Sequence, residues 1–139
     1  MNRRLSLLVL PMAVIVMAPV AASAHGDGPT YTDTYTATAP VPNPSGCNGL
    51  LPSSMDAKQV TAKKSGMLYV QLDGYAGNWN AAVLDGAGKR VAFAATATAA
   101  SQSLEAMVTK GQKFTIQACN AGGTSTATVK YGIGAHHHH

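Results

Sequence analysis

The chain has little charge and few aromatic side chains. Of its 139 residues, 12% are charged and 6% are aromatic. The basic residues are scattered, and beyond residue 24 only Lys63-Lys64 and Lys89-Arg90 are adjacent. Recognition of nucleic acid needs a clustered basic face. We therefore expect no nucleic-acid partner.

Groups able to perform catalysis are also scarce. Apart from the terminal run 136–139, the only histidine is His25. The acidic residues are isolated: Asp27, Asp33, Asp56, Asp73, Asp85 and Glu105. No serine lies in a nucleophile elbow, and no general base stands ready to complete a triad. We expect a protein that is not an enzyme, with no cofactor and no metal site.

A long apolar run occurs once, at the start. Basic Arg3 and Arg4 precede LLVLPMAVIVMAPVA, and the small residues 22–24 follow. This pattern predicts a signal peptide over residues 1–24 with cleavage before His25. A membrane span is disfavoured because Pro11 and Pro19 interrupt the run. We expect a secreted protein, extracellular or periplasmic, with no membrane span after cleavage.

The chain has two cysteines, Cys47 and Cys119. In a secreted protein the default is one disulfide, and closing a loop of about seventy residues would stabilise the fold by about 4 kcal/mol. The alternative is a reactive or metal-binding thiol pair, although no CxxC spacing is present. Residues 135–139 are interpreted as a tail carrying a purification tag, and the alternative is a native metal-binding histidine run.

Short β-rich runs divided by glycine-rich turns predict an all-β fold, a jelly-roll-like antiparallel β-sandwich over residues 47–134. The expected strands are 67–73, 79–84, 89–94, 101–108, 112–119 and 125–133. The loop containing Asp85-Gly86 indicates a hairpin. The run 101–108 fits either a strand or a helical turn. We expect a strand, with Lys110-Gly111 closing a second hairpin.

Residues 25–46 form an extended arm rich in Thr, Tyr and Pro. Alternation from Thr30 to Thr38 places the threonines on one face, and Tyr31 and Tyr35 on the other. Three prolines then break the chain. The arm is either an edge strand of its own domain or a strand that completes another subunit's sheet.

The segments SGMLYVQLDGYAGNWNAAVLDGAGKRVA and VTKGQKFTIQACNAGGTSTATVKYGI resemble the bacterial pre-peptidase C-terminal (PPC-like) domain family over residues 58–133. The resemblance implies a small jelly-roll-like sandwich that serves as an accessory module of exported proteins. Members often carry an aspartate soon after the tryptophan, whereas Asn78 and Asn80 flank Trp79 here. The resemblance therefore implies no calcium site.

Trp79 has two interpretations. Alternation within its strand places Ala81 and Val83 on the same face, which favours a core anchor packed against the 68–72 strand. The alternative is an exposed ligand-contact platform that includes Tyr75 and Tyr69, with Tyr131 as a further companion.

These patterns predict a non-catalytic binding or adhesion module. Its partner would be an extracellular macromolecule or the cell envelope. The alternative is a structural subunit that self-associates through the strand 30–38. A small-molecule carrier is a third class of function, which no residue pattern in the sequence indicates.

Overall fold

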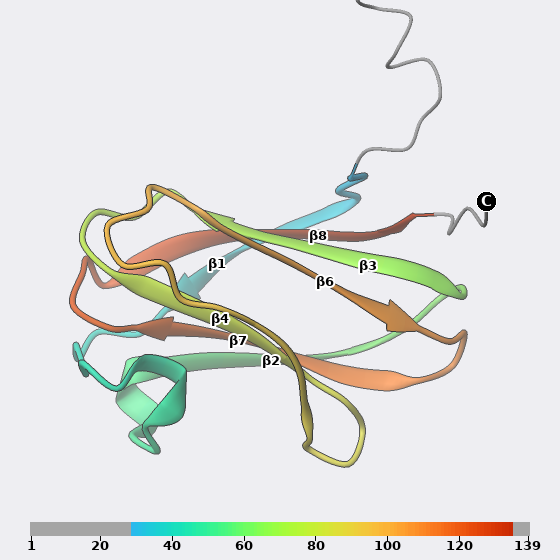
Figure 1. Ribbon diagram of the computed structural model, residues 1–139, viewed down its shortest axis with the longest axis horizontal. Helices are drawn as coiled ribbons and strands as arrows, with labels where there is room; N and C mark the ends of the chain where they lie inside the picture. The colour runs from blue at the N-terminus through green and yellow to red at the C-terminus, as the bar shows by residue number, and fades with distance from the viewer. Residues whose placement is uncertain (1–28, 135–139) are drawn as a thin grey trace, which may run out of the picture.

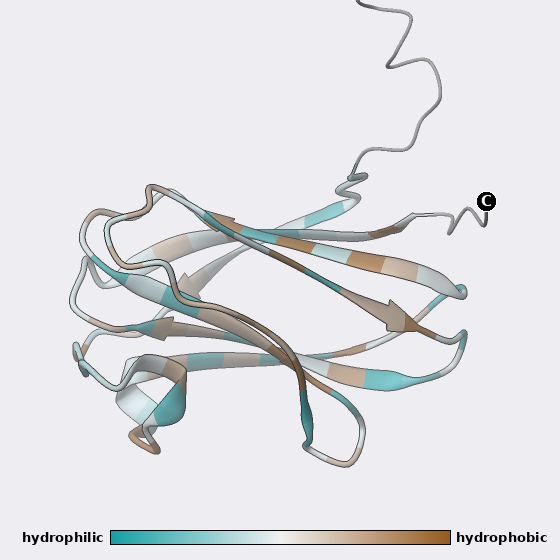
Figure 2. Ribbon diagram, viewed as in Figure 1, coloured by the Kyte–Doolittle hydropathy of each residue, from teal (hydrophilic) through white to brown (hydrophobic). Residues whose placement is uncertain are grey.

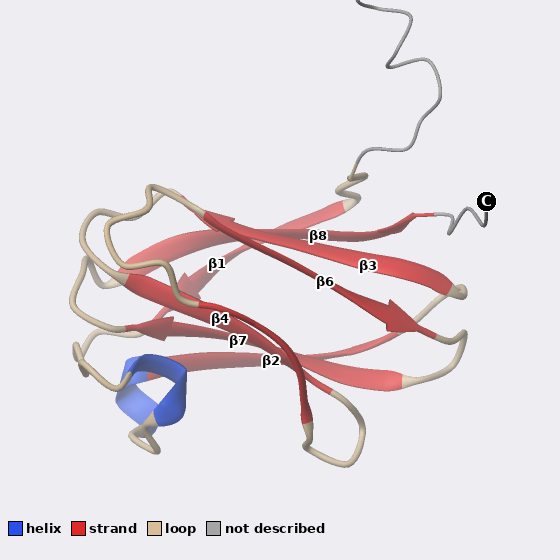
Figure 3. Cartoon of the chain, viewed as in Figure 1, coloured by secondary structure: helices blue, strands red, loops and turns tan. Residues whose placement is uncertain are grey.

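The computed structural model describes residues 29–134, which fold as two four-stranded antiparallel sheets packed face to face (Figures 1 and 3). The first sheet has the order β1 (Asp33–Thr38), β8 (Thr126–Gly134), β3 (Gly66–Asp73), β6 (Gln102–Val108). The second has the order β2 (Met55–Thr61), β7 (Lys113–Asn120), β4 (Trp79–Leu84), β5 (Arg90–Ala94). This is the strand order of an eight-stranded jelly roll. The predicted fold class is confirmed.

The core lies between the sheets and follows from period-two alternation. β3 alternates buried and half-buried residues along its whole length, visible as alternating colours in Figure 2. Buried residues of β3 and β8 on one side and of β4 and β7 on the other form this core: Leu68, Val70, Leu72, Ala127, Val129, Trp79, Ala81, Val83, Phe114, Ile116 and Ala118. Burial of apolar area at about 25 cal/mol per Å² holds the two layers together.

The hairpin from β4 to β5 is confirmed. The Asp85 carboxylate accepts hydrogen bonds from the backbone N–H of Ala87 and Lys89, both at 2.9 Å. Gly88 adopts a φ of +84°, which favours glycine. This turn could be predicted from the sequence because a side chain and a glycine within the loop itself form it.

The second predicted hairpin is wrong, although its strand is confirmed. Residues 102–108 form β6, but β6 pairs with β3, whereas the next strand, β7, pairs with β2 and β4 in the other sheet. The connection between them crosses from sheet to sheet, where Gly111 donates to the carbonyl of Ala62 at 2.8 Å. The sequence of a turn does not show whether it joins neighbouring strands of one sheet or connects a strand of one sheet to a strand of the other.

Strand β2 was not expected. Its sequence MDAKQVT lies at a sheet edge and contains no fully buried residue. An edge strand with so few inward apolar side chains lacks the alternation by which strands are recognised.

The predicted arm is the edge strand β1. It pairs with β8 of its own chain from Asp33 opposite Tyr131 to Thr38 opposite Thr126. The sandwich therefore includes residues ahead of the expected start at 47. As predicted, Thr34, Thr36 and Thr38 are exposed while Tyr35 points inward.

Tyr31 departs from the predicted face shared with Tyr35. The carbonyl of Thr30 crosses β8 so closely that a Cβ on Gly132 would lie 2.1 Å from it. Tyr31 precedes the paired strand and, unlike Tyr35, does not pack against the core cluster. Burial raises its pKa, and the charges of Asp73 and Tyr69, two residues outside that cluster, raise it further. The missing side chain at Gly132 lets the backbone leave the strand path, which alternation alone could not predict.

The disulfide between Cys47 and Cys119 is confirmed, with the two residues 72 apart in the chain. It joins the short 3₁₀ turn Gly46–Asn48 to β7, beside Ala82 and Met55. A second turn, Pro52–Ser54, leads into β2. Among residues 29–134, no helix is long and apolar enough to cross a membrane. The predicted signal peptide 1–24, the first residues of the arm and the tail 135–139 lie outside the described residues.

Candidate functional site

Trp79 is a core residue. It is 0% exposed, and its indole N–H donates to the carbonyl of Thr124 at 2.9 Å. Ala81 and Val83 share its inward face, as expected. The strand of Leu68 and Leu72 is not its partner within a sheet, however, because β4 pairs with β5 and β7 while β3 lies in the opposite sheet. Full burial leaves no ring face for an external ligand.

The other residues of the predicted platform do not join Trp79 at a common surface. Tyr75 packs beside it, with ring centroids 6.2 Å apart, and donates its hydroxyl to the carbonyl of Ala99 at 2.9 Å. Burial raises the pKa of Tyr75. Tyr69 lies away from the core, and its ring packs near Gly134. A three-residue aromatic platform is therefore not formed.

Charged residues line up instead where the edge strands β1 and β2 face each other across the sandwich, which we call the seam. At one end the Asp56 carboxylate accepts a hydrogen bond from the backbone N–H of Thr38 at 2.9 Å. In the middle the Lys58 ammonium lies 5.0 Å from the centroid of the Tyr35 ring. Such a cation–π contact is worth about 0.5–1 kcal/mol at an exposed site. These two contacts close the seam over part of its length.

Tyr35 is held as a neutral phenol within the seam. Burial raises its pKa, and the negative charge of Asp56 and the nearby Tyr131 raise it further. Its hydroxyl is buried and has no hydrogen-bond partner among the described residues. The ring meets that of Tyr131 edge to face, with centroids 6.1 Å apart.

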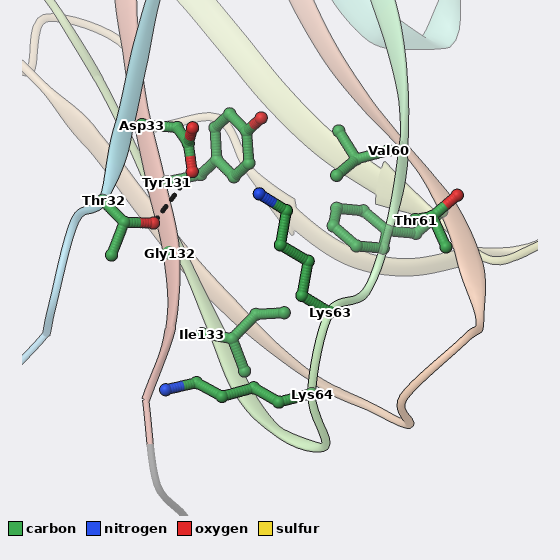
Figure 4. A pocket seen from close by; sticks show the side chains of 10 residues that line it. Thr32, Asp33, Val60, Thr61, Lys63, Lys64, Tyr131, Gly132 and Ile133 are labelled. Carbon is green, nitrogen blue, oxygen red and sulfur yellow. Dashed lines mark hydrogen bonds between the residues drawn. The ribbon is translucent and has the colours of Figure 1, made fainter.

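At the other end the seam opens into a pocket of about 420 Å³. Its lining comes from the beginning of the β1 segment, the end of β2, the β2–β3 connection, β7 and β8: Thr32, Asp33, Val60, Thr61, Lys63, Lys64, Phe114, Tyr131, Gly132 and Ile133. Figure 4 shows these side chains. Sheet edges that are not hydrogen-bonded to each other leave this space at the end of the core.

The floor of the pocket is apolar. Phe114 is buried, and Val60, Tyr131 and Ile133 are half-buried and pack against the core cluster. Burial and the negative charge of Asp33 raise the pKa of Tyr131, which keeps its hydroxyl neutral. The floor is therefore a continuation of the hydrophobic core that reaches solvent.

The rim of the pocket is charged. Lys63 and Lys64 are exposed, and the Lys63 ammonium points toward Asp33 and Tyr131 (Figure 4). The Asp33 carboxylate accepts a hydrogen bond from the Thr32 hydroxyl at 2.8 Å. The one ion pair of the described part of the chain joins Lys130 to Asp73 at 3.7 Å, so neither rim lysine is engaged in one. The rim therefore carries two ammonium groups and one carboxylate, a net charge of +1.

The sequence signal for this pocket was faint. Lys63-Lys64 was visible only as an adjacent basic pair, and Asp33 only as an isolated acid. Pairing between β1 and β8 places Asp33 opposite Tyr131, and the connection from β2 to β3 carries Lys63 and Lys64 to the same pocket. Within residues 29–134, no three His, Cys, Asp or Glu side chains gather in a way that could hold a metal ion.

Comparison with known protein families finds no family model that matches the chain, and comparison with curated proteins finds no match.

Proposed function

We propose that the protein is a secreted, non-catalytic binding module that attaches to an extracellular macromolecule or to the envelope surface through the pocket at the end of the seam. The observation that carries this proposal is the combination of an apolar floor with two rim lysines that are not engaged in ion pairs. Ligand sites commonly combine a mostly apolar lining with a few placed polar groups.

Two further features support an exported accessory module. The Cys47–Cys119 disulfide is compatible with an oxidising compartment. The resemblance of residues 58–133 to the PPC-like family implies a jelly-roll-like sandwich, and the strand order agrees with that expectation. Fold alone does not imply function, so the pocket remains the stronger support.

The test uses the chain from His25 with residues 136–139 removed, so that terminal histidines do not compete. Sedimentation would measure its binding to isolated envelope material and to insoluble neutral and acidic polysaccharides. Replacing both rim lysines, Lys63→Ala and Lys64→Ala, should weaken binding to the preferred material by about three- to tenfold, since exposed charges each contribute modestly.

The control removes two charges elsewhere, through Lys89→Ala and Lys113→Ala. Both residues are exposed and lie outside the pocket lining. Binding that falls equally in both double variants would indicate unspecific charge attraction and would overturn the pocket assignment. Binding to none of the materials would overturn the binding module itself.

The second candidate is a structural subunit assembled through residues 30–38. The observation that favours it is that β1 is an edge strand, paired on one side only. An edge strand of this kind can be exchanged between subunits. Deleting residues 25–39 and measuring the oligomeric state by size exclusion separates the two: loss of a larger species supports assembly, whereas a monomer before and after deletion supports the intramolecular strand.

A further inference from the structure

We propose that the group held in the pocket is a single carboxylate attached to an apolar body. The inference rests on the proposed function, because it names the chemistry that the same pocket would recognise. It depends on three features of the lining: what the floor offers, how the charges balance, and how large the space is.

The floor favours an apolar body over a sugar. Val60, Phe114 and Ile133 offer carbon surface and no polar side-chain atom. The Thr32 hydroxyl is already used as a donor to Asp33. On the floor only Tyr131 carries a hydroxyl. Sugar hydroxyls buried against Val60, Phe114 and Ile133 would lose their hydrogen bonds to water without replacement by these side chains, which is unfavourable for each unpaired group. An alkyl or aromatic group gains by the same burial.

The charges favour one negative charge over two. Lys63 and Lys64 attract an anion, but Asp33 stands at the same rim and repels it. A monocarboxylate matches the net charge of these three groups, whereas a doubly charged phosphate would face the Asp33 carboxylate without compensation. Asp33 therefore disfavours doubly charged anions, and the two lysines attract the singly charged carboxylate.

The volume sets the size of the body. At about 420 Å³ the pocket is at the small end of ligand sites, which span roughly 300–1,000 Å³. An octyl chain or one large apolar side chain fits this description better than a polycyclic ligand. Two sources supply the same chemistry: a free fatty acid, and the C-terminal residue of a hydrophobic peptide.

The experiment is a titration followed by ¹H–¹⁵N NMR on the His25-start chain without residues 136–139. The probes are octanoate, octan-1-ol, acetate and galacturonate. Octanoate should shift the amide signals of Phe114, Gly132 and Ile133. It should bind about three- to tenfold more tightly than octan-1-ol, which lacks the charge, and at least about tenfold more tightly than acetate or galacturonate, which lack the apolar body.

Variants then locate the binding. Lys63→Ala with Lys64→Ala should weaken octanoate binding by about three- to tenfold and leave octanol unchanged. The Lys89→Ala and Lys113→Ala pair should change neither affinity. Asp33→Asn should strengthen the binding of octyl phosphate more than that of octanoate, since it removes the repulsion of the second charge.

Two further outcomes would overturn the inference. If octanol binds as tightly as octanoate, the pocket does not recognise a carboxylate. If galacturonate binds more tightly than octanoate, the pocket prefers a sugar to an apolar body. If octanoate fails to bind while binding in the sedimentation assay still requires Lys63 and Lys64, the ligand class is wrong and the proposal of a binding module is retained. If the protein binds none of the materials in the sedimentation assay while octanoate binds at the pocket, the proposed attachment to the envelope is wrong and the carboxylate site is retained.

The source is decided by two peptides, acetyl-Ala-Leu with a free carboxylate and the same peptide as an amide. Tighter binding of the free acid than of octanoate would assign the pocket to chain ends, and tighter binding of octanoate would assign it to fatty acids. In either case the amide should bind at least several-fold more weakly than the acid, and equal binding of acid and amide would contradict the proposal.

Discussion

The two long sides of the sandwich are closed by different chemistry. Between the end of β5 and the start of β6, the Gln102 side chain is 2% exposed and both of its polar atoms bond to the backbone of Thr96, at 3.0 and 2.8 Å. Between β1 and β2, Asp56 and Lys58 close part of the seam and leave a pocket at its end. A neutral amide with all its hydrogen bonds made can be sealed from water.

Charged side chains cannot be sealed in this way. Lys58 is exposed and places its ammonium over the Tyr35 ring without burying it, because a fully buried charge would lose its hydration. The side closed by Gln102 is therefore structural. The seam remains accessible to solvent, and the pocket lies at its end.

The largest effect is expected at Trp79, which lies near the closed side beside Tyr75. Replacing it, Trp79→Ala, should destabilise the fold by about 3–5 kcal/mol in urea unfolding, because the cavity has no side chain to fill it. In the native protein its fluorescence should be blue-shifted and poorly quenched by iodide. Strong quenching would contradict its full burial, and Phe93→Ala, at a residue 40% exposed, serves as the milder control.

The disulfide tests how firmly the segment between β1 and β2 is anchored. Replacing both cysteines, Cys47→Ala and Cys119→Ala, should lower the free energy of unfolding by about 2–4 kcal/mol while the circular dichroism of the sheets persists. Two free thiols by mass spectrometry, in protein exported under oxidising conditions, would show that the bond does not form.

A matched pair of variants compares the two sides directly. Gln102→Ala should destabilise by about 1–3 kcal/mol because it leaves the N–H and carbonyl of Thr96 without partners. Lys58→Ala should cost about 0.5–1 kcal/mol, the worth of one exposed cation–π contact. Equal effects in urea unfolding would mean that the two sides are closed with the same strength, contrary to the distinction drawn above.

The smallest effect near neutral pH is expected at the Tyr35 hydroxyl, and it grows at alkaline pH. The folded state raises the pKa of Tyr35, whereas an unfolded tyrosine ionises near pH 10. Above about pH 10 the unfolded chain therefore loses this proton first, and stability falls as pH rises toward the folded pKa. Tyr35→Phe should leave stability at pH 7 nearly unchanged and reduce the alkaline loss, and a parallel fall in both proteins would exclude Tyr35 as the cause.

Much of the fold could be predicted because its signals are local. The alternation of Phe114, Ile116 and Ala118 places β7 correctly, and Asp85 with Gly88 marks the hairpin between β4 and β5. The fold-back of β1 was one of two alternatives, since its Thr and Tyr pattern suits pairing with either chain. Strand β2 was missed because an exposed edge strand has no apolar alternation to recognise.

The sequence by itself determined the strand-rich character, the inward faces of most strands and the cysteine pairing, because alternation, glycine turns and a cysteine count depend on neighbours along the chain. Only the tertiary structure decided that β6 and β7 lie in different sheets, that Tyr31 leaves its expected face at Gly132, and that Asp33 meets Lys63 at a pocket. Those outcomes depend on which edges end up opposite each other. That choice is made by the packing of two whole sheets around one core, and no local pattern encodes it.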